Sequence, residues 1–369
     1  MAVNLQIRTI ESSQAAEIYI SAVPRAKVPL QEQAEQIFSG IRDILRSKHA
    51  HIFQERVFAA KTVMEKVTQI RSEIYGDIDD GVKLSFLICR QGLLGPLAGV
   101  QVHAISTDTP PEVVCVDTIP SGRVVRTPNC RYLGLSAISA PQAGQPMQQA
   151  QVMLEKAESA LKQFGADFLS VPRTWIWLNH IISWYDDFNQ VRNQFFGEHG
   201  ILQDGQRSPM PASTGIGLGP ANGAMCAMDL TAVLQPSNSI RYLQAGGKQH
   251  SALEYGSAFS RASQAITPAG QTVFVSGTAS INASGATINI GDALGQINTT
   301  IDNVRAVLSD MNCADKDIVQ VTAYCKTAEV EWIFNRLKSD FDWPWVTMIC
   351  DICRPELLFE VEATSVSCR

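Results

Sequence analysis

QTVFVSGTASIN (271–282) begins the most regular part of the sequence and predicts a β-strand that ends in a Gly/Asn turn. The next segments predict a strand, a helix, a strand, a helix and two strands: ATINI (286–290), GDALGQINTTIDNVRAVLSDMN (291–312), DIVQVTAYC (317–325), EVEWIFNRLKSDF (329–341), WVTMICDIC (345–353) and LLFEVEATSV (357–366). Pro355 and Glu356 mark the last turn. The order β-β-α-β-α-β-β predicts an α+β layer, with helices on one face of an antiparallel sheet.

The first part of the sequence is less regular. Its candidate elements are two helical stretches within 31–75, strands at 82–89 and 95–106, an amphipathic helix at 145–165, a strand at 167–178 and a helix at 180–200. Residues 234–255 are polar and lack periodicity, so we place a domain boundary there. We therefore predict two domains, 1–240 and 241–369, of which the first is a divergent α+β domain related to the second.

The composition is that of a globular protein. Of the 369 residues, 45% are apolar and 18% are charged, which excludes disorder, collagen and coiled coil. The formal net charge is −6 and no basic run occurs, so we expect no nucleic-acid or membrane-surface binding. Any anionic ligand must be bound by individually placed arginines. The nine cysteines are widely spaced, no signal peptide is recognised, and no apolar stretch reaches the ~18 residues that span a membrane. We expect a cytoplasmic protein with reduced thiols.

The regular segment resembles the RidA/YjgF (chorismate-mutase-like) fold. The pieces that carry this resemblance are FVSG (274–277), IDNVRAVLSDMNCADKDIVQVTAYCK (301–326), FNRLKSDFD (334–342) and FEVEATSV (359–366). The whole chain is similar to chorismatases, which join such a domain to a divergent N-terminal one. The supporting pieces are RYLGLSAIS (131–139), RTWIWL (173–178), YDDFNQVRNQFF (185–196), STGIG (213–217), FSRA (259–262) and CRPELLFE (353–360). The resemblance implies cleavage of the enolpyruvyl ether of chorismate to pyruvate and a cyclic carboxylate, without metal or organic cofactor.

Two glutamates on the last predicted strand are the main candidates for acid catalysis. Glu360 and Glu362 are two residues apart, so both side chains point to the same face. Burial would raise the pKa of such a carboxyl group and make it a general acid near neutral pH. The alternative from residue pattern alone is an edge strand with a solvated polar face. The resemblance places Glu360 at the essential acid of chorismatases.

Cys350 and Cys353 form a C-x-x-C pair that we do not interpret as a metal or redox site. No second ligand pair is present, and spacing on a strand would put the thiols on opposite faces. Cys350 is predicted to fill the core. The resemblance implies that Cys353 marks members forming 3-hydroxybenzoate, whereas Ala262 is typical of simple hydrolases. The product is therefore 3-hydroxybenzoate, with 4-hydroxybenzoate as a further product, or 3,4-dihydroxycyclohexa-1,5-diene carboxylate.

Arginines suit the two carboxylates of chorismate, because a guanidinium binds a carboxylate through two hydrogen bonds. Arg261 and Arg354 are the preferred anchors, and Arg131 is the next candidate. The hydroxyls of Tyr132 and Thr214 could bond a ring hydroxyl or a carboxylate. The glycine-rich STGIGLGP lacks the spacing of a phosphate-binding loop.

Two other functions are compatible with a RidA-like domain. A RidA-type imine deaminase needs an arginine in the strand WVTMIC, where this sequence has Thr347. A non-catalytic member would bind a small carboxylate in a cleft between domains or subunits. RidA domains commonly form trimers, and a fused N-terminal domain could cover that surface. We expect a monomer or a homotrimer.

Overall fold

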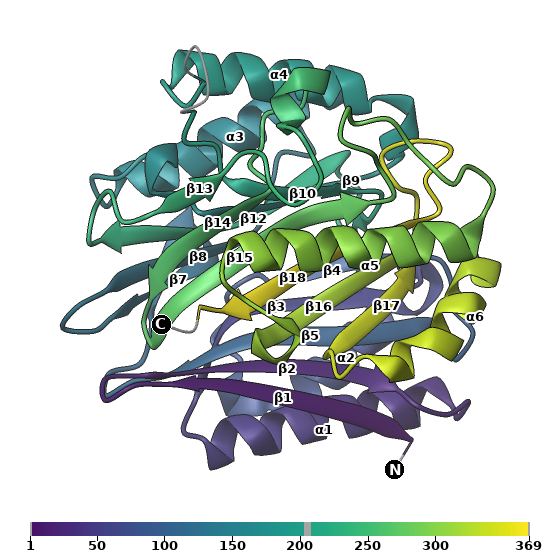
Figure 1. Ribbon diagram of the computed structural model, residues 1–369. Coiled ribbons are helices and arrows are strands. Elements are labelled where there is room, and N and C mark those ends of the chain that lie inside the picture. Colours follow the sequence, from purple (N-terminus) through teal and green to yellow (C-terminus); the bar gives the residue numbers. More distant parts are fainter. Residues whose placement is uncertain (1, 203–207, 368–369) are drawn as a thin grey trace.

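The computed structural model describes residues 2–202 and 208–367, and Cys368 lies outside this part. Three six-stranded sheets form its centre and the long helices lie on the outside (Figure 1). This architecture confirms the predicted α+β class. None of the described helices is long and apolar enough to span a membrane.

Three units follow one another along the chain. Unit 1 (residues 3–106) consists of β1 (Val3–Glu11), β2 (Ala16–Pro24), α1 (Leu30–Ser47), β3 (His51–Ala59), α2 (Met64–Tyr75), β4 (Ser85–Ile88) and β5 (Leu97–Ser106). Unit 2 (residues 112–235) consists of β6 (Glu112–Val116), β7 (Ile119–Arg126), β8 (Arg131–Ser139), α3 (Pro146–Lys162), β9 (Arg173–Leu178), α4 (Tyr185–Glu198), β10 (Ala212–Ile216), β11 (Gly219–Pro220) and β12 (Cys226–Gln235). Unit 3 (residues 241–366) consists of β13 (Arg241–Leu243), β14 (Ala262–Thr267), β15 (Gly270–Ala279), α5 (Ala293–Asp310), β16 (Ile318–Cys325), α6 (Ala328–Leu337), β17 (Trp345–Ile349) and β18 (Phe359–Val366).

All three units have the same chain path. The strand orders are β1-β2-β5-β3-β4, β7-β8-β12-β9-β10 and β14-β15-β18-β16-β17, with β11, β6 and β13 added at edges. In each unit an antiparallel pair is followed by helix, strand, helix and a parallel strand, and the last strand inserts in the middle. The segment 1–240, predicted as one domain, thus contains two units with the topology of the third.

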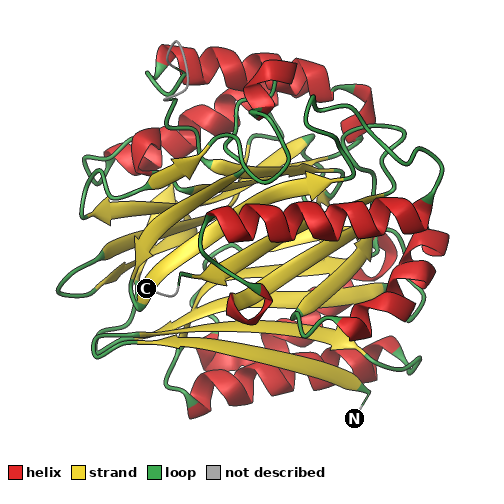
Figure 2. Ribbon diagram, viewed as in Figure 1, coloured by secondary structure: helices red, strands yellow, loops and turns green. Residues whose placement is uncertain are grey.

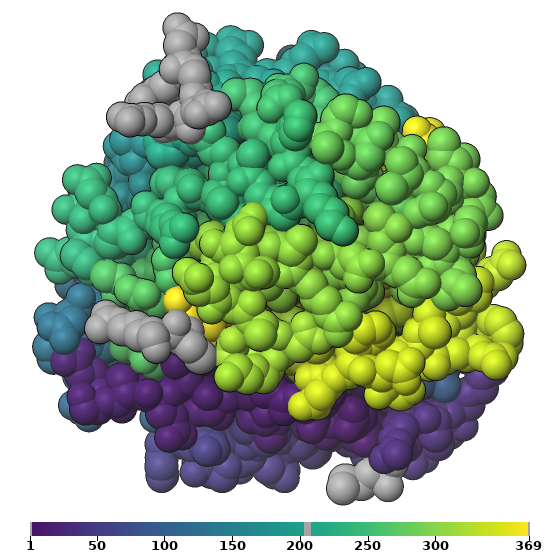
Figure 3. All heavy atoms as spheres, viewed as in Figure 1, coloured from purple at the N-terminus to yellow at the C-terminus, as the bar shows by residue number. Residues whose placement is uncertain are grey.

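The sheets pack against one another around a common centre. Aromatic residues from each unit meet in one buried cluster, among them Phe53, Trp177 and Tyr324. Each sheet also packs its other face against its own helices, and three further apolar clusters fill those layers. The helices therefore cover the outside of all three sheets (Figure 2). In the space-filling view, the differently coloured parts of the chain pack directly against one another (Figure 3).

Polar side chains are also buried between the sheets, where each unit bonds to the next. Asp229 of β12 accepts a hydrogen bond from Arg56 of unit 1, with 2.8 Å between Oδ2 and Nε. Glu362 of β18 accepts one from Arg173 of unit 2, with 2.6 Å between Oε2 and Nη2. A buried charge that loses its partner costs about 3–5 kcal/mol. These pairs therefore fix the relative positions of the units.

Three local predictions were wrong. Residues 51–59 form β3, although the sequence indicated only helices between 31 and 75. Residues 286–290 form no strand and contribute only an isolated bridge between Thr287 and Ile281. β17 ends at Ile349, so the predicted strand 345–353 is too long. Its last residues belong to a loop that runs from 350 to 358.

Candidate active site

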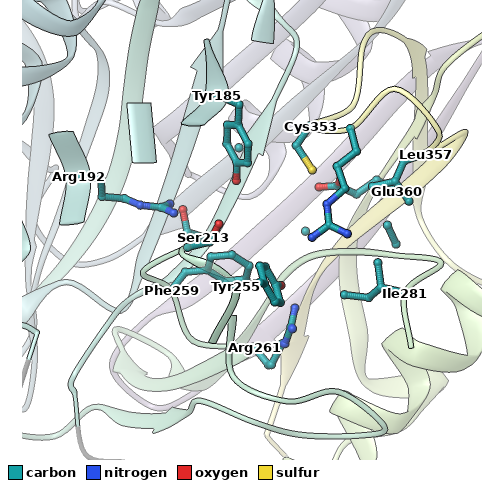
Figure 4. A pocket seen from close by; sticks show the side chains of 15 residues that line it. Tyr185, Arg192, Ser213, Tyr255, Phe259, Arg261, Ile281, Cys353, Leu357 and Glu360 are labelled. Carbon is teal, nitrogen blue, oxygen red and sulfur yellow. The ribbon is translucent and has the colours of Figure 1, made fainter. Parts of the chain in front are cut away.

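A pocket lies between units 2 and 3, and the space in it, counted together with the solvent at its mouth, is about 560 Å³. We call it the 2–3 cleft, and its lining comprises Tyr185, Arg192, Ser213, Gly215, Tyr255, Ser257, Phe259, Arg261, Gly277, Ala279, Ile281, Cys353, Arg354, Leu357 and Glu360. Figure 4 shows Glu360 and Cys353 on one side, with Tyr185 and Arg192 opposite.

Glu360 is a buried carboxyl group that faces this cavity. As predicted, it shares a strand face with Glu362, while Phe359 and Val361 pack on the helix side. Burial, followed by the negative charge of Glu362, raises the pKa of Glu360 to about 8. No hydrogen bond or ion pair joins the carboxyl group of Glu360 to another described residue. A neutral carboxyl group is therefore available to donate a proton into the cavity.

Glu362 is held differently, although it lies on the same face. Its carboxylate accepts hydrogen bonds from Arg173, from Trp175 Nε1 at 3.1 Å and from Thr322 Oγ1 at 3.1 Å. All its partners belong to the centre of the molecule. Glu362 therefore binds unit 3 to unit 2 and acts on Glu360 through its charge.

The other two units have no acid at the position of Glu360. Glu360 lies opposite Tyr324, the residue before the last of β16. At the same position β12 has Ala227, opposite Trp177 of β9, and β5 has Gly99, opposite Phe58 of β3. Only the 2–3 cleft thus combines the repeated architecture with an acid on the inserted strand.

Three arginines give the 2–3 cleft a positive lining. Arg261 donates from Nε and Nη2 to the His250 carbonyl at 3.0 and 2.9 Å, and Arg354 donates from Nη1 to the Gly285 carbonyl at 2.6 Å. Arg192 donates from Nη2 to Asn189 Oδ1 at 2.7 Å, and its Nε has no partner among the described residues. Each guanidinium keeps donors for a ligand, so the cleft suits a dicarboxylate.

Aromatic rings hold these arginines in place. Arg261 and Arg354 lie over the ring of Tyr255, with 5.5 and 5.3 Å to its centroid. Arg192 and Arg261 lie over the ring of Phe259, at 5.8 and 5.6 Å. Cation–π contacts and neutral acceptors leave the positive charges available to a ligand.

Two glycines provide the room at the bottom of the cleft. Gly277 lies at a bulge of β15, where the pairing with β18 shifts, and a Cβ atom there would overlap Glu360 Oε1. A Cβ atom on Gly215 would come within 3.2 Å of the Tyr185 ring. Close approach of the backbone thus explains glycine at both positions.

Cys353 lies in the loop 350–358, next to Glu360 in the cleft. The prediction that Cys350 and Cys353 occupy opposite faces of one strand does not apply, because the strand has already ended. Burial, then the charge of Glu360, raises the pKa of the Cys353 thiol to about 12, so this thiol is neutral. Cys350 fills the central apolar cluster.

The structure does not bring three predicted residues to the cleft. The methyl group of Ala262 packs with Val273 and Val275 on the helix side of β14. The Tyr132 ring is buried in the central cluster and stacks on Phe53 at 5.1 Å. Arg131 lies over the ring of Phe164, outside the lining of the 2–3 cleft. Strand alternation turns the Ala262 side chain to the helix layer, whereas Arg131 and Tyr132 lie on β8, which contributes no residue to the lining of the 2–3 cleft.

Thr214 lies beside the cleft rather than in its lining. Its hydroxyl accepts a hydrogen bond from Arg173 at 2.6 Å, and its neighbours Ser213 and Gly215 reach the cavity. Tyr185 and Arg192 of α4 were not predicted, although they are seven residues apart and thus share a helix face. Ser213 and Tyr255 had no distinguishing pattern in the sequence. Within the described residues no group of three or more His, Cys, Asp or Glu side chains could hold a metal.

Comparison with known proteins agrees with this architecture. Residues 253–366 match the family model described as Endoribonuclease L-PSP. The crystal structure of a chorismatase at 1.08 Å resolution superposes over 99% of this chain and 100% of its own, with a TM-score of 0.63 and 17% sequence identity. A probable translation initiation inhibitor from Rhodopseudomonas palustris covers 35% of this chain and 98% of its own, with a TM-score of 0.30 and 18% identity. A search of curated proteins finds no match. The chain thus has the chorismatase fold, with an L-PSP-type domain at its C-terminal end.

Proposed function

We propose that this chain, which has the chorismatase fold, cleaves the enolpyruvyl ether of chorismate to pyruvate and 3-hydroxybenzoate, with 4-hydroxybenzoate as a further product. The observation that carries this proposal is the buried Glu360 carboxyl, whose pKa is raised to about 8, in a cavity ringed by three arginines. A neutral acid and a cationic lining are what protonation of a dianionic enol ether requires. The reaction needs no metal or organic cofactor.

Glu360 starts the reaction as a general acid. It gives its proton to the methylene carbon of the enol ether, and the ether carbon becomes an oxocarbenium ion. The new Glu360 carboxylate faces that cation across the cleft. The ring hydroxyl then loses its proton and adds to the oxocarbenium carbon, and the bond between that oxygen and the ring breaks, so this oxygen leaves as the keto oxygen of pyruvate. The original ether bond to the former enolpyruvyl carbon breaks, its oxygen stays on the ring, and loss of a ring C–H proton makes the ring aromatic. Chorismate thus divides into pyruvate and a hydroxybenzoate without net consumption of water.

The arginines bind the substrate's two carboxylates. Arg261 and Arg354 flank Tyr255 near Glu360, and Arg192 lies opposite with its Nε unpartnered. A bidentate contact holds a carboxylate in one position and also neutralises its negative charge. Two anchors on opposite sides of the ether would hold the methylene carbon at Glu360.

Cys353 is proposed to steer the ring product. Its neutral thiol is small, polarizable and a weak donor, so it can pack against the ring without attacking the cation. The alternative product, 3,4-dihydroxycyclohexa-1,5-diene carboxylate, forms when water captures the cation instead. Ala262 is not included in this proposal, because its methyl group lies on the other face of the sheet.

An imine deaminase of the RidA type is less well supported. The arginine expected at Thr347 of β17 is also missing from the corresponding positions, which are Gly215 in β10 and Phe86 in β4. Endonuclease activity on RNA would need basic side chains along an extended groove, whereas these arginines line one pocket between units 2 and 3.

The test is incubation of the purified protein with chorismate, with pyruvate measured by lactate dehydrogenase and the ring product by chromatography. We expect stoichiometric pyruvate and a hydroxybenzoate. If no pyruvate forms at high protein concentration, the proposal is wrong. If the diene diol is the sole ring product, the proposed cleavage of chorismate is correct and the proposed role of Cys353 is wrong.

A further inference from the structure

Loop 350–358 forms one wall of the 2–3 cleft and connects the end of β17 to the start of β18. Its residues Cys353, Arg354 and Leu357 line the cleft (Figure 4). Glu360 lies within β18, where pairing with β15 and β16 fixes its position. Cys353 and Arg354 have no strand pairing with any described residue. Other contacts must therefore hold these two side chains in the cleft.

Lys326 holds the middle of this loop. It directly follows β16 and is half-buried. Its Nζ donates to the carbonyl of Pro355 at 2.8 Å and to that of Arg354 at 3.3 Å, and its backbone N–H donates to the Leu358 carbonyl at 2.9 Å. A charged donor forms a stronger hydrogen bond than a neutral one. One lysine therefore fixes the loop backbone at Arg354 and again near the end of the loop.

Gln296 of α5 holds the last part of the loop. This side chain is fully buried, and its Nε2 donates to the Glu356 carbonyl at 2.9 Å while its Oε1 accepts the Leu358 N–H at 2.7 Å. Nε2 also donates to the Asn289 carbonyl at 3.3 Å, in the segment that connects β15 to α5. The same segment supplies the Gly285 carbonyl that accepts the hydrogen bond of Arg354. One amide thus joins the two loops between which the Arg354 side chain lies.

The acid and the residues around it are therefore positioned by different means. We propose that Lys326 and Gln296 are positioning residues of the 2–3 cleft, which hold loop 350–358 so that Arg354 and Cys353 face the substrate. Glu360 is positioned by β18 without them. The kinetic consequences of this inference rest on the proposed function, whereas the order of the loop does not.

The first test measures the loop without substrate, by hydrogen–deuterium exchange of the full-length protein. Lys326→Met keeps the length of the side chain and removes the ammonium, and Gln296→Met removes the amide. In both variants, peptides covering 350–358 should exchange at least about threefold faster, because local opening no longer breaks these hydrogen bonds. Peptides within β18 should keep the wild-type exchange.

The second test measures chorismate cleavage in the same variants. The KM should rise at least about fivefold, because Arg354 is no longer held in position, and the diene diol should increase among the ring products. The kcat for pyruvate release and the fall in activity near pH 8 should stay as in the wild type, since Glu360 is not moved. General destabilisation of the protein would not separate KM from kcat in this way.

Two further variants complete the design. Lys326→Arg should restore most of the loop order and of the KM, because a guanidinium can also donate to two carbonyls. The matched control is Lys316→Met, which changes an exposed lysine of the same unit and should leave exchange, KM and products unchanged.

Wild-type exchange of the loop in both methionine variants would overturn the inference, and so would faster exchange with an unchanged KM. A lower kcat with a shifted pH dependence would also overturn it, because the two residues would then act on Glu360. If the wild-type protein releases no pyruvate, the proposed function is wrong, and the exchange experiment alone decides whether Lys326 and Gln296 hold the loop.

Discussion

Replacing Glu360 by glutamine keeps the size of the side chain and removes the proton that the proposed reaction needs. General acid catalysis contributes ~10²–10⁴-fold to a rate. Glu360→Gln should therefore lower pyruvate release by at least about a hundredfold. In the wild type, activity should fall as the pH rises through about 8, because Glu360 then loses its proton.

The same substitution should change stability in a pH-dependent way. The pKa of Glu360 rises from 4.5 to about 8 on folding, so the folded state binds this proton more tightly. Its stabilising effect is complete below pH 4.5 and is lost as the pH rises through 8. Between pH 5.5 and pH 8 the free energy of unfolding therefore falls by the equivalent of about 2.5 pKa units, which is roughly 3 kcal/mol at ~1.36 kcal/mol per unit. Glutamine does not titrate and avoids this loss.

The assay is thermal unfolding of both proteins at pH 5.5 and pH 9. With an unfolding entropy of ~2.1 cal/mol/K per residue, 3 kcal/mol corresponds to about 4 °C for a chain of this length. The Tm of Glu360→Gln minus that of the wild type should thus be about 4 °C larger at pH 9. The control is Glu331→Gln, a buried glutamate outside the 2–3 cleft, which should keep chorismate cleavage.

Two results would refute this reasoning about Glu360. A loss of pyruvate release under tenfold would exclude it as the acid. A Tm difference that stays constant between pH 5.5 and pH 9 would show that its carboxyl does not titrate in this range.

Three further predictions concern the other residues of the cleft. Arg261→Ala and Arg354→Ala should each raise the KM for chorismate at least about tenfold in steady-state assays. Lysine at either position should restore little, since an ammonium cannot bind a carboxylate bidentately. If both alanine variants keep the wild-type KM, other residues bind the carboxylates. Cys353→Ala should keep pyruvate release, but chromatography should show the diene diol in place of the hydroxybenzoate. If the ring product is unchanged, the thiol only packs against its neighbours. Gly277→Ala should displace the Glu360 carboxyl and lower kcat with a smaller effect on KM; unchanged kcat would show that the bulge can adjust.

The regular C-terminal part of the fold was predictable because its strands and helices follow simple periodicities. Strand β3 was not predictable, since the polar run Gln54, Glu55 and Arg56 resembles the exposed part of a helix. These side chains are buried, and Arg56 finds its acceptor in Asp229, 173 residues later. No local pattern reveals a polar residue whose partner lies in another unit.

The candidate site was predictable only in part, for a related reason. Glu360 and the cleft arginines Arg261 and Arg354 belong to unit 3, where the resemblance is strongest. Arg192 belongs to unit 2 and reaches the same cavity only because the two sheets meet there. Ala262 shares its sequence neighbourhood with Arg261, but the alternation of β14 sends its side chain to the helix layer.

The three units are joined in one polypeptide, and this has a genetic consequence. In an assembly of three identical chains, one codon would change every cleft at once, so an acid acquired in one place would appear three times. Here Glu360, Ala227 and Gly99 are encoded separately. Each cleft can therefore mutate under its own selection, and a binding site can arise in one without disturbing catalysis in another.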